Sequence, residues 1–254
     1  MKLHFLALVL AIPVASAAFG QEIHSEHCLH GCPLGGKPTD DLVIRDIYIL
    51  RSNNMTKLAD WVAYRVTQDT IGRSQRRNWR ADPLLQDHER LEPDDYRGAN
   101  AALRVDRGHQ APLASFSGTE YWPETNYLSN ITPQRSALNQ GPWMRLERAV
   151  RTLAKTQDVD NVYVQTGPLF ERPMPLLPNA DKAHMVPSGY WKIVAIPEGE
   201  TISVAAFVME QETPRNADLC EYETTVVEIE TRAQLRFFHH HRAEFSSLGS
   251  EFGC

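Results

Sequence analysis

The pattern of apolar and polar positions predicts a sheet with a few helices packed against it. Short runs of β-branched and aromatic residues, typical of strands, occur at 41–52, 61–67 and 161–170. Residues 190–210 predict a β-hairpin, because Pro197–Gly199 interrupts two such runs with turn-forming residues. We therefore expect an α+β fold in a single domain, with a mainly antiparallel sheet and packed helices.

One long amphipathic helix is expected over residues 139–157. Apolar side chains recur there at three- and four-residue steps and would form one face, namely Trp143, Leu146, Val150 and Leu153. Pro142 suits the first turn, where its missing N–H costs nothing. The opposite side carries Arg145, Glu147, Arg148, Arg151 and Lys155. A second helix is expected at about 224–235, and residues 72–100 are expected to form a long polar connection.

Residues 1–17 predict a secretory signal peptide. Lys2 precedes an apolar run, and Ala15-Ser16-Ala17 supplies a small-residue cleavage pattern. The apolar run is too short for a membrane anchor, and no later stretch is long and apolar enough to span a bilayer. We expect cleavage near Ala17/Ala18 and a secreted, soluble domain of residues 18–254.

Export to an oxidising compartment changes what the four cysteines predict. Four cysteines allow three pairings, and the sequence does not formally choose between them. Proximity favours Cys28–Cys32, which leaves Cys220–Cys254 to hold the C-terminal tail. A metal site is the alternative, but the Cys-x3-Cys spacing has no second pair nearby, and secretion favours disulfides.

The charge of the chain is unevenly distributed. The net charge of −6 argues weakly against a polyanionic partner. Residues 73–155, however, carry 13 Lys and Arg against 10 Asp and Glu, so the remainder is strongly acidic. An acidic body with one basic face can bind phosphates. The alternative is a random scatter of charge on a solvated surface.

Two local patterns are weak indicators of chemistry. Residues 31–37 spell G-x-x-x-x-G-K, but Pro38 stands where a phosphate-binding loop needs Ser or Thr, and Cys32 is expected in a disulfide. The run His239–His241 has the composition of a metal-binding tract, although such runs more often lie on a flexible surface.

The segment RVDRGHQAPLAS at 104–115 is more informative. It places four residues side by side that ordinary packing does not require together: Asp106, Arg107, Gly108 and His109. A lone histidine is usually structural or solvated. Residues 126–143, NYLSNITPQRSALNQGPW, are dense in carboxamides and poor in carboxylates, and the basic helix face follows them. Two such polar segments bracketed by arginines indicate a phosphate site.

These segments resemble the DNA/RNA non-specific endonucleases, the secreted Serratia-type nucleases. The resemblance is carried by DRGH, NYLSNITPQ and LNQGPWMRLE, and it is supported by RNW at 77–79, VYVQTGPLF and KAHMVPSGYWK. It extends from about Cys28 past Cys220, and the C-terminal tail matches least. It implies hydrolysis of phosphodiester bonds inside single- and double-stranded DNA and RNA, with 5′-phosphate products.

The resemblance also implies a ββα-metal site, in which two strands and a helix bind one Mg²⁺, with Mn²⁺ as a substitute. On that pattern His109 is the general base, Asn139 the direct metal ligand, and Glu147 a ligand through water. Phosphate binding or charge stabilisation falls to Arg77, Arg107 and Arg151, and Asn130 supports the centre. We further expect Asp106 to give a supporting hydrogen bond and Gly108 to permit a close backbone turn.

These roles agree with the chemistry of phosphodiester hydrolysis. A neutral imidazole accepts a proton near neutral pH, an amide oxygen with several waters suits Mg²⁺ or Mn²⁺, and arginine forks match phosphate geometry. Glu147 and Arg151, at i and i+4, are expected to brace each other. Two alternatives stay open: a nucleic-acid-binding module without catalysis, and a phosphodiesterase for small or lipid substrates. The sequence also leaves a homodimer open.

Overall fold

The computed structural model describes residues 23–37, 39–199, 201–241 and 245–254. The expected signal peptide therefore lies outside the described residues. Within those ranges, no helix combines the length and the apolar character that a membrane span requires.

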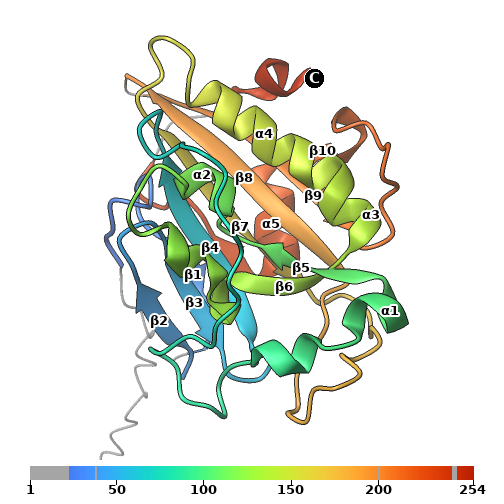
Figure 1. The fold of residues 1–254 in the computed structure, drawn as a ribbon. Coiled ribbons are helices and arrows are strands. Elements are labelled where there is room, and N and C mark those ends of the chain that lie inside the picture. The colour runs from blue at the N-terminus through green and yellow to red at the C-terminus, as the bar shows by residue number, and fades with distance from the viewer. Residues whose placement is uncertain (1–22, 38, 200, 242–244) are drawn as a thin grey trace, which may run out of the picture.

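A twisted antiparallel sheet forms the centre of the molecule (Figure 1). Its strands lie in the order β10 (Glu223–Thr224), β9 (Thr201–Glu210), β8 (Gly189–Glu198), β7 (Val162–Leu169), β4 (Leu58–Val66), β3 (Ile49–Asn53) and β2 (Asp41–Ile44). The short β12 (Ser246–Ser247) is the exception, since it pairs parallel to β9. The expected α+β class with a mainly antiparallel sheet is confirmed.

The expected hairpin and strands are present, with shifted boundaries. β8 and β9 pair along their full length, from Gly189 with Glu210 to Glu198 with Thr201. The run at 41–52 forms two strands, β2 and β3, because the chain turns between them and the Arg45 N–H donates to the Tyr48 carbonyl at 2.9 Å.

Both faces of the sheet are covered, so its central strands are apolar on both sides. Side chains alternate between the faces of a strand. On β8, Tyr190 and Val194 join the core beneath α4 (Met144–Leu153), whereas Trp191 and Ile193 join the core beneath α5 (Val226–Ala233). Figure 1 shows α4 in front of the sheet and α5 behind it.

The helix predicted at 139–157 has the wrong boundaries at both ends. A short α3 (Ser136–Leu138) leads into a π-helical turn (Asn139–Trp143), and α4 itself spans only Met144–Leu153. Gly141 has non-helical angles (φ −111°, ψ −115°), and Pro142 brings no N–H to the helical hydrogen bonds. A Cβ on Gly141 would lie 2.6 Å from the Arg215 carbonyl oxygen, so glycine is required here.

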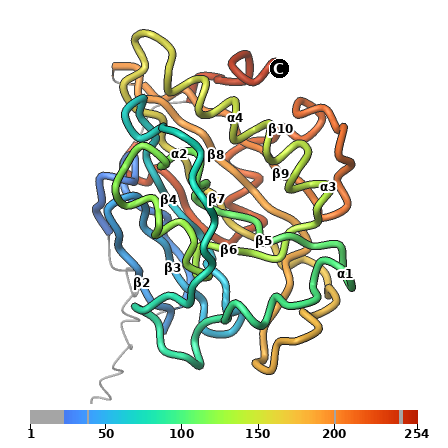
Figure 2. Tube along the Cα trace, viewed as in Figure 1, coloured from blue at the N-terminus to red at the C-terminus, as the bar shows by residue number. Residues whose placement is uncertain are grey.

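A separate two-stranded ribbon lies beside the sheet. β5 (Val105–His109) pairs antiparallel with β6 (Ile131–Arg135). Short helices flank it: α1 (Ala99–Leu103), α2 (Leu113–Phe116) and 3-10 turns at Pro93–Tyr96, Trp122–Asn126 and Leu128–Asn130. The expected long connection runs down beside the ribbon before it reaches α1 (Figure 2), and Arg80 forms a β-bridge with Tyr127 on the way.

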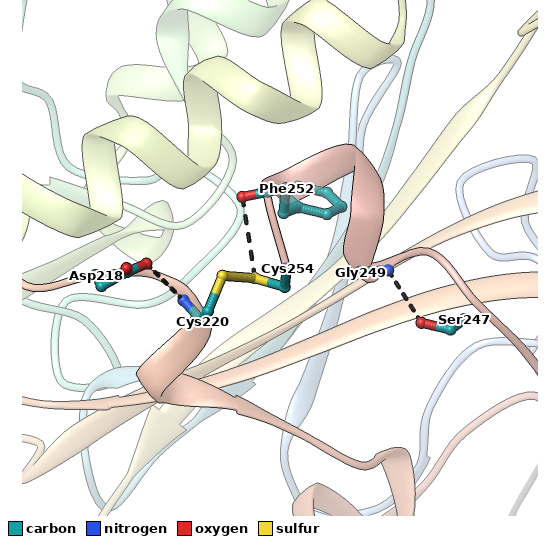
Figure 3. Close-up of a disulfide and its surroundings, with 6 residues drawn as sticks. All are labelled: Asp218, Cys220, Ser247, Gly249, Phe252 and Cys254. Atoms are coloured by element: carbon teal, nitrogen blue, oxygen red, sulfur yellow. Dashed lines mark hydrogen bonds between the residues drawn. A yellow bond between two sulfur atoms is a disulfide. The ribbon is translucent and has the colours of Figure 1, made fainter.

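The structure contains both expected disulfides. Cys28 bonds to Cys32 across 4 residues, and Cys220 bonds to Cys254 across 34. The first lies in the core beneath α5, close to the small sheet of β1 (Leu34–Gly35) and β11 (Leu235–Arg236). The second joins two 3-10 turns, Cys220–Tyr222 and the end of Gly249–Phe252 (Figure 3). It therefore fixes the C-terminal tail to the end of the sheet.

The two disulfides are expected to differ in their contribution to stability. Replacing Cys220 and Cys254 with serine should lower the free energy of unfolding by about 4 kcal/mol, against about 2 kcal/mol for the Cys28 and Cys32 pair, because the larger closed loop restricts the unfolded chain more. Guanidinium unfolding monitored by circular dichroism measures both. Equal losses, or a larger loss for the short loop, would contradict this expectation.

Candidate active site

A cavity of about 470 Å³ lies between the ribbon, α1, the π-helical turn and the long connection. Its lining residues are Arg77, Trp79, Tyr96, Ala99, Asn100, Val105, Asp106, Arg107, His109, Asn139 and Gln140. Four of the residues expected to act in catalysis thus meet in one cavity: His109, Asn139, Arg77 and Arg107. Asn130, Glu147 and Arg151 are not among the lining residues.

His109 ends β5 and presents its ring to the cavity. The ring lies 5.2 Å from that of Trp79, and its buried Nε2 has no hydrogen-bond partner in the described part of the chain. Burial lowers the pKa of His109 to about 3, and the charge of Arg77 acts in the same direction, against a smaller contribution from Asn126. The imidazole is therefore neutral at pH 7, with one nitrogen free to accept a proton.

Asp106 is the most heavily hydrogen-bonded residue of the cavity. Its carboxylate accepts from four side chains at 2.7–3.0 Å, those of Asn100, Ser136, Asn139 and Gln140. Burial alone would raise its pKa, but these hydrogen bonds outweigh burial, so the pKa lies below its ordinary value. The single supporting bond expected from the sequence is thus a network that joins β5 to α1, α3 and the π-helical turn.

Asn139 opens the π-helical turn, where Asp106 fixes its amide. Nδ2 donates to Asp106 at 2.9 Å, which leaves the carbonyl oxygen as the amide atom available to a cation. One amide oxygen beside an ionised carboxylate is a donor set that suits a hard, hydrated cation. No three His, Cys, Asp or Glu side chains of the described residues gather as a metal site, and the described His239–His241 run is no exception.

Arg107 is held by aromatic rings and by the long connection. Its guanidinium lies 5.8 Å from the Trp79 ring and 5.3 Å from the Tyr96 ring, and Nη2 donates to the Pro93 carbonyl at 2.9 Å. Arg77, by contrast, is exposed at the cavity. The cavity therefore presents to an anion one positive charge held by neighbouring groups and one that is exposed to solvent.

Gly108 does not form the turn expected from the sequence. It pairs with Thr132 in the middle of the ribbon, with no positive φ. A Cβ there would lie 2.5 Å from Oε1 of Gln134. Glycine fits here because the Gln134 side chain, whose own Cβ would lie 2.8 Å away, occupies the space that a side chain would need.

Asn130 lies fully buried behind His109. Its Oδ1 accepts from the Ala111 N–H at 2.8 Å, and its Nδ2 donates to the carbonyls of Ala111 and Thr125, both at 2.9 Å. The side chain thus fixes the backbone two residues beyond His109. Asn130 holds the strand end in place and does not face the cavity.

Glu147 and Arg151 lie on α4, close enough to the cavity to be coupled to it by charge. Burial raises the pKa of Glu147, and the charges of Lys192, Arg151 and Arg77 oppose that increase. No salt bridge joins Glu147 to Arg151 in the described structure, so the expected i, i+4 brace is not formed. Nη1 of Arg151 is buried and has no hydrogen-bond partner among the described residues. Because Arg77 influences both Glu147 and His109, it links the helix to the cavity.

Four aromatic or polar residues that line the cavity were not singled out in the sequence: Trp79, Tyr96, Asn100 and Gln140. Trp79 had a signal, since it belongs to the RNW segment, but only Arg77 received a role there. Asn100 and Tyr96 had none, because the long connection and α1 bring them to β5 only through the tertiary fold. Gln140 follows Asn139 in the chain and donates a hydrogen bond to the same carboxylate, that of Asp106.

Comparison with known proteins agrees with this geometry. Residues 24–244 match the family described as DNA/RNA non-specific endonuclease. The chain is 48% identical over 235 residues to the protein named Nuclease of Serratia marcescens, which covers 92% of this chain and 87% of that protein.

A more distant relative and a solved structure of similar fold agree with this match. A nuclease of Syncephalastrum racemosum is 31% identical over 241 residues, covering 85% of this chain and 73% of that protein. Among solved structures, a crystal structure of the EndoG/EndoGI complex superposes with a TM-score of 0.72 at 23% identity, covering 84% of this chain and 92% of that chain. The chain belongs to the family of DNA/RNA non-specific endonucleases.

Proposed function

We propose that this protein is a secreted endonuclease that cleaves DNA and RNA with His109 as general base and one Mg²⁺ held by Asn139. The observation that carries the proposal is the cavity that joins a neutral imidazole, a fixed amide oxygen and two arginines. A binding module without catalysis would not need a histidine kept neutral beside such a donor set.

His109 supplies the proton acceptor. Its unpartnered Nε2 takes a proton from the attacking water, and Trp79 limits the access of other solvent to the ring. Because burial keeps the imidazole neutral, the base is ready over the whole physiological pH range. Asn130 holds the strand end, so that the ring stays at the same place in the cavity.

The residues around Asn139 fit a divalent cation. Asn139 would bind it through Oδ1, and Glu147 would hold it through water molecules. When bound, the cation polarises the phosphate and stabilises the departing oxygen. Asp106 keeps the Asn139 carbonyl turned toward the cavity and adds negative charge there. We infer products with 5′-phosphates and 3′-hydroxyls.

The arginines recognise phosphate and not bases. Arg77 and Arg107 line the cavity, and Arg151 presents a buried, unpartnered nitrogen beside Glu147. Contacts to phosphates carry little sequence information, which supports cleavage of DNA and RNA, single- and double-stranded, at many sites.

Secretion and assembly complete the proposal. Two disulfides support folding in an oxidising compartment, outside the cytoplasm. We further propose that the signal peptide directs the protein to export and that the mature domain is soluble. The sequence leaves a homodimer open, and sedimentation would measure the oligomeric state.

Substitution of His109 is the experiment that tests the function. His109→Ala should lower the rate of plasmid cleavage by about 100- to 10,000-fold because the proton acceptor is lost, while Mg²⁺ and DNA binding persist. The exposed His88→Ala is the matched control and should cleave normally. A His109→Ala protein with normal activity would remove the base from the mechanism.

The pH dependence of activity is a second test of His109 as the general base. Protonation abolishes a general base, so activity should fall as the pH decreases through the pKa of His109. Because burial lowers that pKa to about 3, this limb of kcat/KM should lie well below the ordinary value of 6.5. The limb should be missing from any residual activity of His109→Ala. An acid limb that is identical in both proteins would assign it to another group.

Metal dependence separates Asn139 from Glu147. EDTA should abolish activity and Mg²⁺ or Mn²⁺ should restore it. Asn139→Ala should then lose most turnover at any Mg²⁺ concentration, since it removes a direct ligand, whereas Glu147→Ala should lose less and recover partly at higher Mg²⁺. Asn54→Ala, in the turn between β3 and β4 and outside the cavity lining, is the control. Full activity after exhaustive metal removal is the result that would exclude this site.

The arginines should affect both nucleic acids alike. Arg77→Ala, Arg107→Ala and Arg151→Ala should each reduce cleavage of DNA and RNA by similar factors, because phosphate is common to both substrates. Binding of the wild type should weaken as salt rises. Parallel assays on DNA and RNA of matched length measure this, and a variant with altered base preference at an unchanged rate would contradict it.

A further inference from the structure

A second cavity, of about 280 Å³, adjoins the candidate active site. It lies between the end of α1, the ribbon of β5 and β6, and the loop that joins β7 to β8 (Figure 1). Val105 lines both cavities, and α1 contributes residues to both. A strand of nucleic acid that passes through the first cavity therefore has the second beside it.

Part of the second cavity is an apolar wall, formed by Leu103, Val105, Met174 and Val186. These four side chains pack in one cluster of buried and half-buried residues. The cavity volume lies near the lower limit of ligand cavities, about 300 Å³, which suits one flat ring system better than a larger ligand. A nucleobase meets this requirement, because its face packs on apolar groups and a methionine thioether contacts aromatic rings favourably.

Two arginines, Arg104 and Arg135, bring positive charge to the same cavity. The Arg104 side chain is exposed and forms no hydrogen bond or salt bridge with another described residue. Nη2 of Arg135 lies 3.8 Å from the Glu212 carboxylate, which also pairs with Arg172. One carboxylate is thus shared by two arginines while Arg104 has none, so positive charge is left over for an anion such as a phosphate.

The backbone fixes Arg104 at the edge of this cavity. Arg104 ends α1 with left-handed angles (φ 55°, ψ 35°), which glycine adopts at less cost than arginine. Its carbonyl accepts from the Ser136 N–H at 2.8 Å, and the Ser136 hydroxyl donates to Asp106 at 2.7 Å. The second cavity is therefore connected to the hydrogen bonds of Asp106, and it carries an arginine where glycine would suit the backbone better.

We propose that the second cavity is a subsite for one unpaired nucleotide of the substrate strand, with its base against the apolar wall and a neighbouring phosphate bound by Arg104 and Arg135. The inference rests on the proposed function, since it extends the path of the strand beyond the cavity of His109. A base that packs against the apolar wall has left its pair and its stack, so the subsite acts on single-stranded DNA and RNA.

Binding of an oligonucleotide to the full chain in EDTA tests the subsite without catalysis. The probe is a fluorescent single strand of about twelve nucleotides, titrated at several salt concentrations. Arg104→Gln should weaken binding about fivefold and reduce the salt slope by about 0.7, the value for one phosphate of a single strand. Met174→Gln should weaken binding without a change of slope, because it removes apolar contact and no charge. Arg236→Gln, exposed in β11, is the matched control and should bind as the wild type does.

Cleavage gives a second readout. Met174→Gln should lower kcat/KM more for single-stranded than for duplex DNA of the same length, since only an unpaired base reaches the apolar wall. Wild-type binding by both cavity variants overturns the inference, and so does an effect of Arg104→Gln without one of Met174→Gln, because the cavity then holds no base. Arg104→Gly suits the left-handed backbone and should reproduce the loss of Arg104→Gln; recovered binding would attribute that loss to the backbone and overturn the phosphate contact. An inactive wild type contradicts the proposed function instead, while binding in EDTA still reports on the subsite.

Discussion

The carboxylate of Asp106 is the interaction on which the site depends. It accepts hydrogen bonds from Asn100 on α1, Ser136 on α3, and Asn139 and Gln140 on the π-helical turn. The helix α1 and the continuous segment of α3 and the π-helical turn are thereby joined to β5. Because β5 also carries His109, the same strand fixes the proposed base and, through Asp106, the amide proposed to bind the cation. Loss of this one carboxylate would release both sides of the cavity.

The interruption of the helix at Gly141 and Pro142 gives the site its two parts. A regular helix from 139 would carry Asn139 and Glu147 on one continuous surface. The π-helical turn instead directs Asn139 into the cavity, while α4 lies over the sheet and carries Glu147, which does not line the cavity. Tight contact between Gly141 and the Arg215 backbone keeps the turn in this form. The second part is connected to the cavity by charge, through Arg77.

The spacing of apolar residues and the turn residues were enough to predict the strands, the β8–β9 hairpin and α5, because both signals lie within short segments of the chain. They did not predict the start of α4. The helical spacing of apolar residues continues through Gly141 and Pro142, but the regular helical backbone is interrupted there. The same limit applies to the site. His109 and Asn139 belong to dense polar segments, but Trp79 and Asn100 reach the cavity only through the long connection and α1. Gly108 was assigned to a turn because the sequence does not show that Gln134 lies close to it on the other strand of the ribbon.

The electrostatic character of the cavity follows from the lowered pKa values of two groups on one strand, His109 and Asp106. Burial with few partners keeps His109 neutral, while burial with four hydrogen-bond donors keeps Asp106 ionised. At pH 7 the cavity then holds a free base on one side and a fixed negative charge on the other, with arginines at its rim. A phosphodiester needs all three, since a proton must leave the water, a cation must be held near the phosphate, and the phosphate must be drawn in despite the net negative charge of the chain.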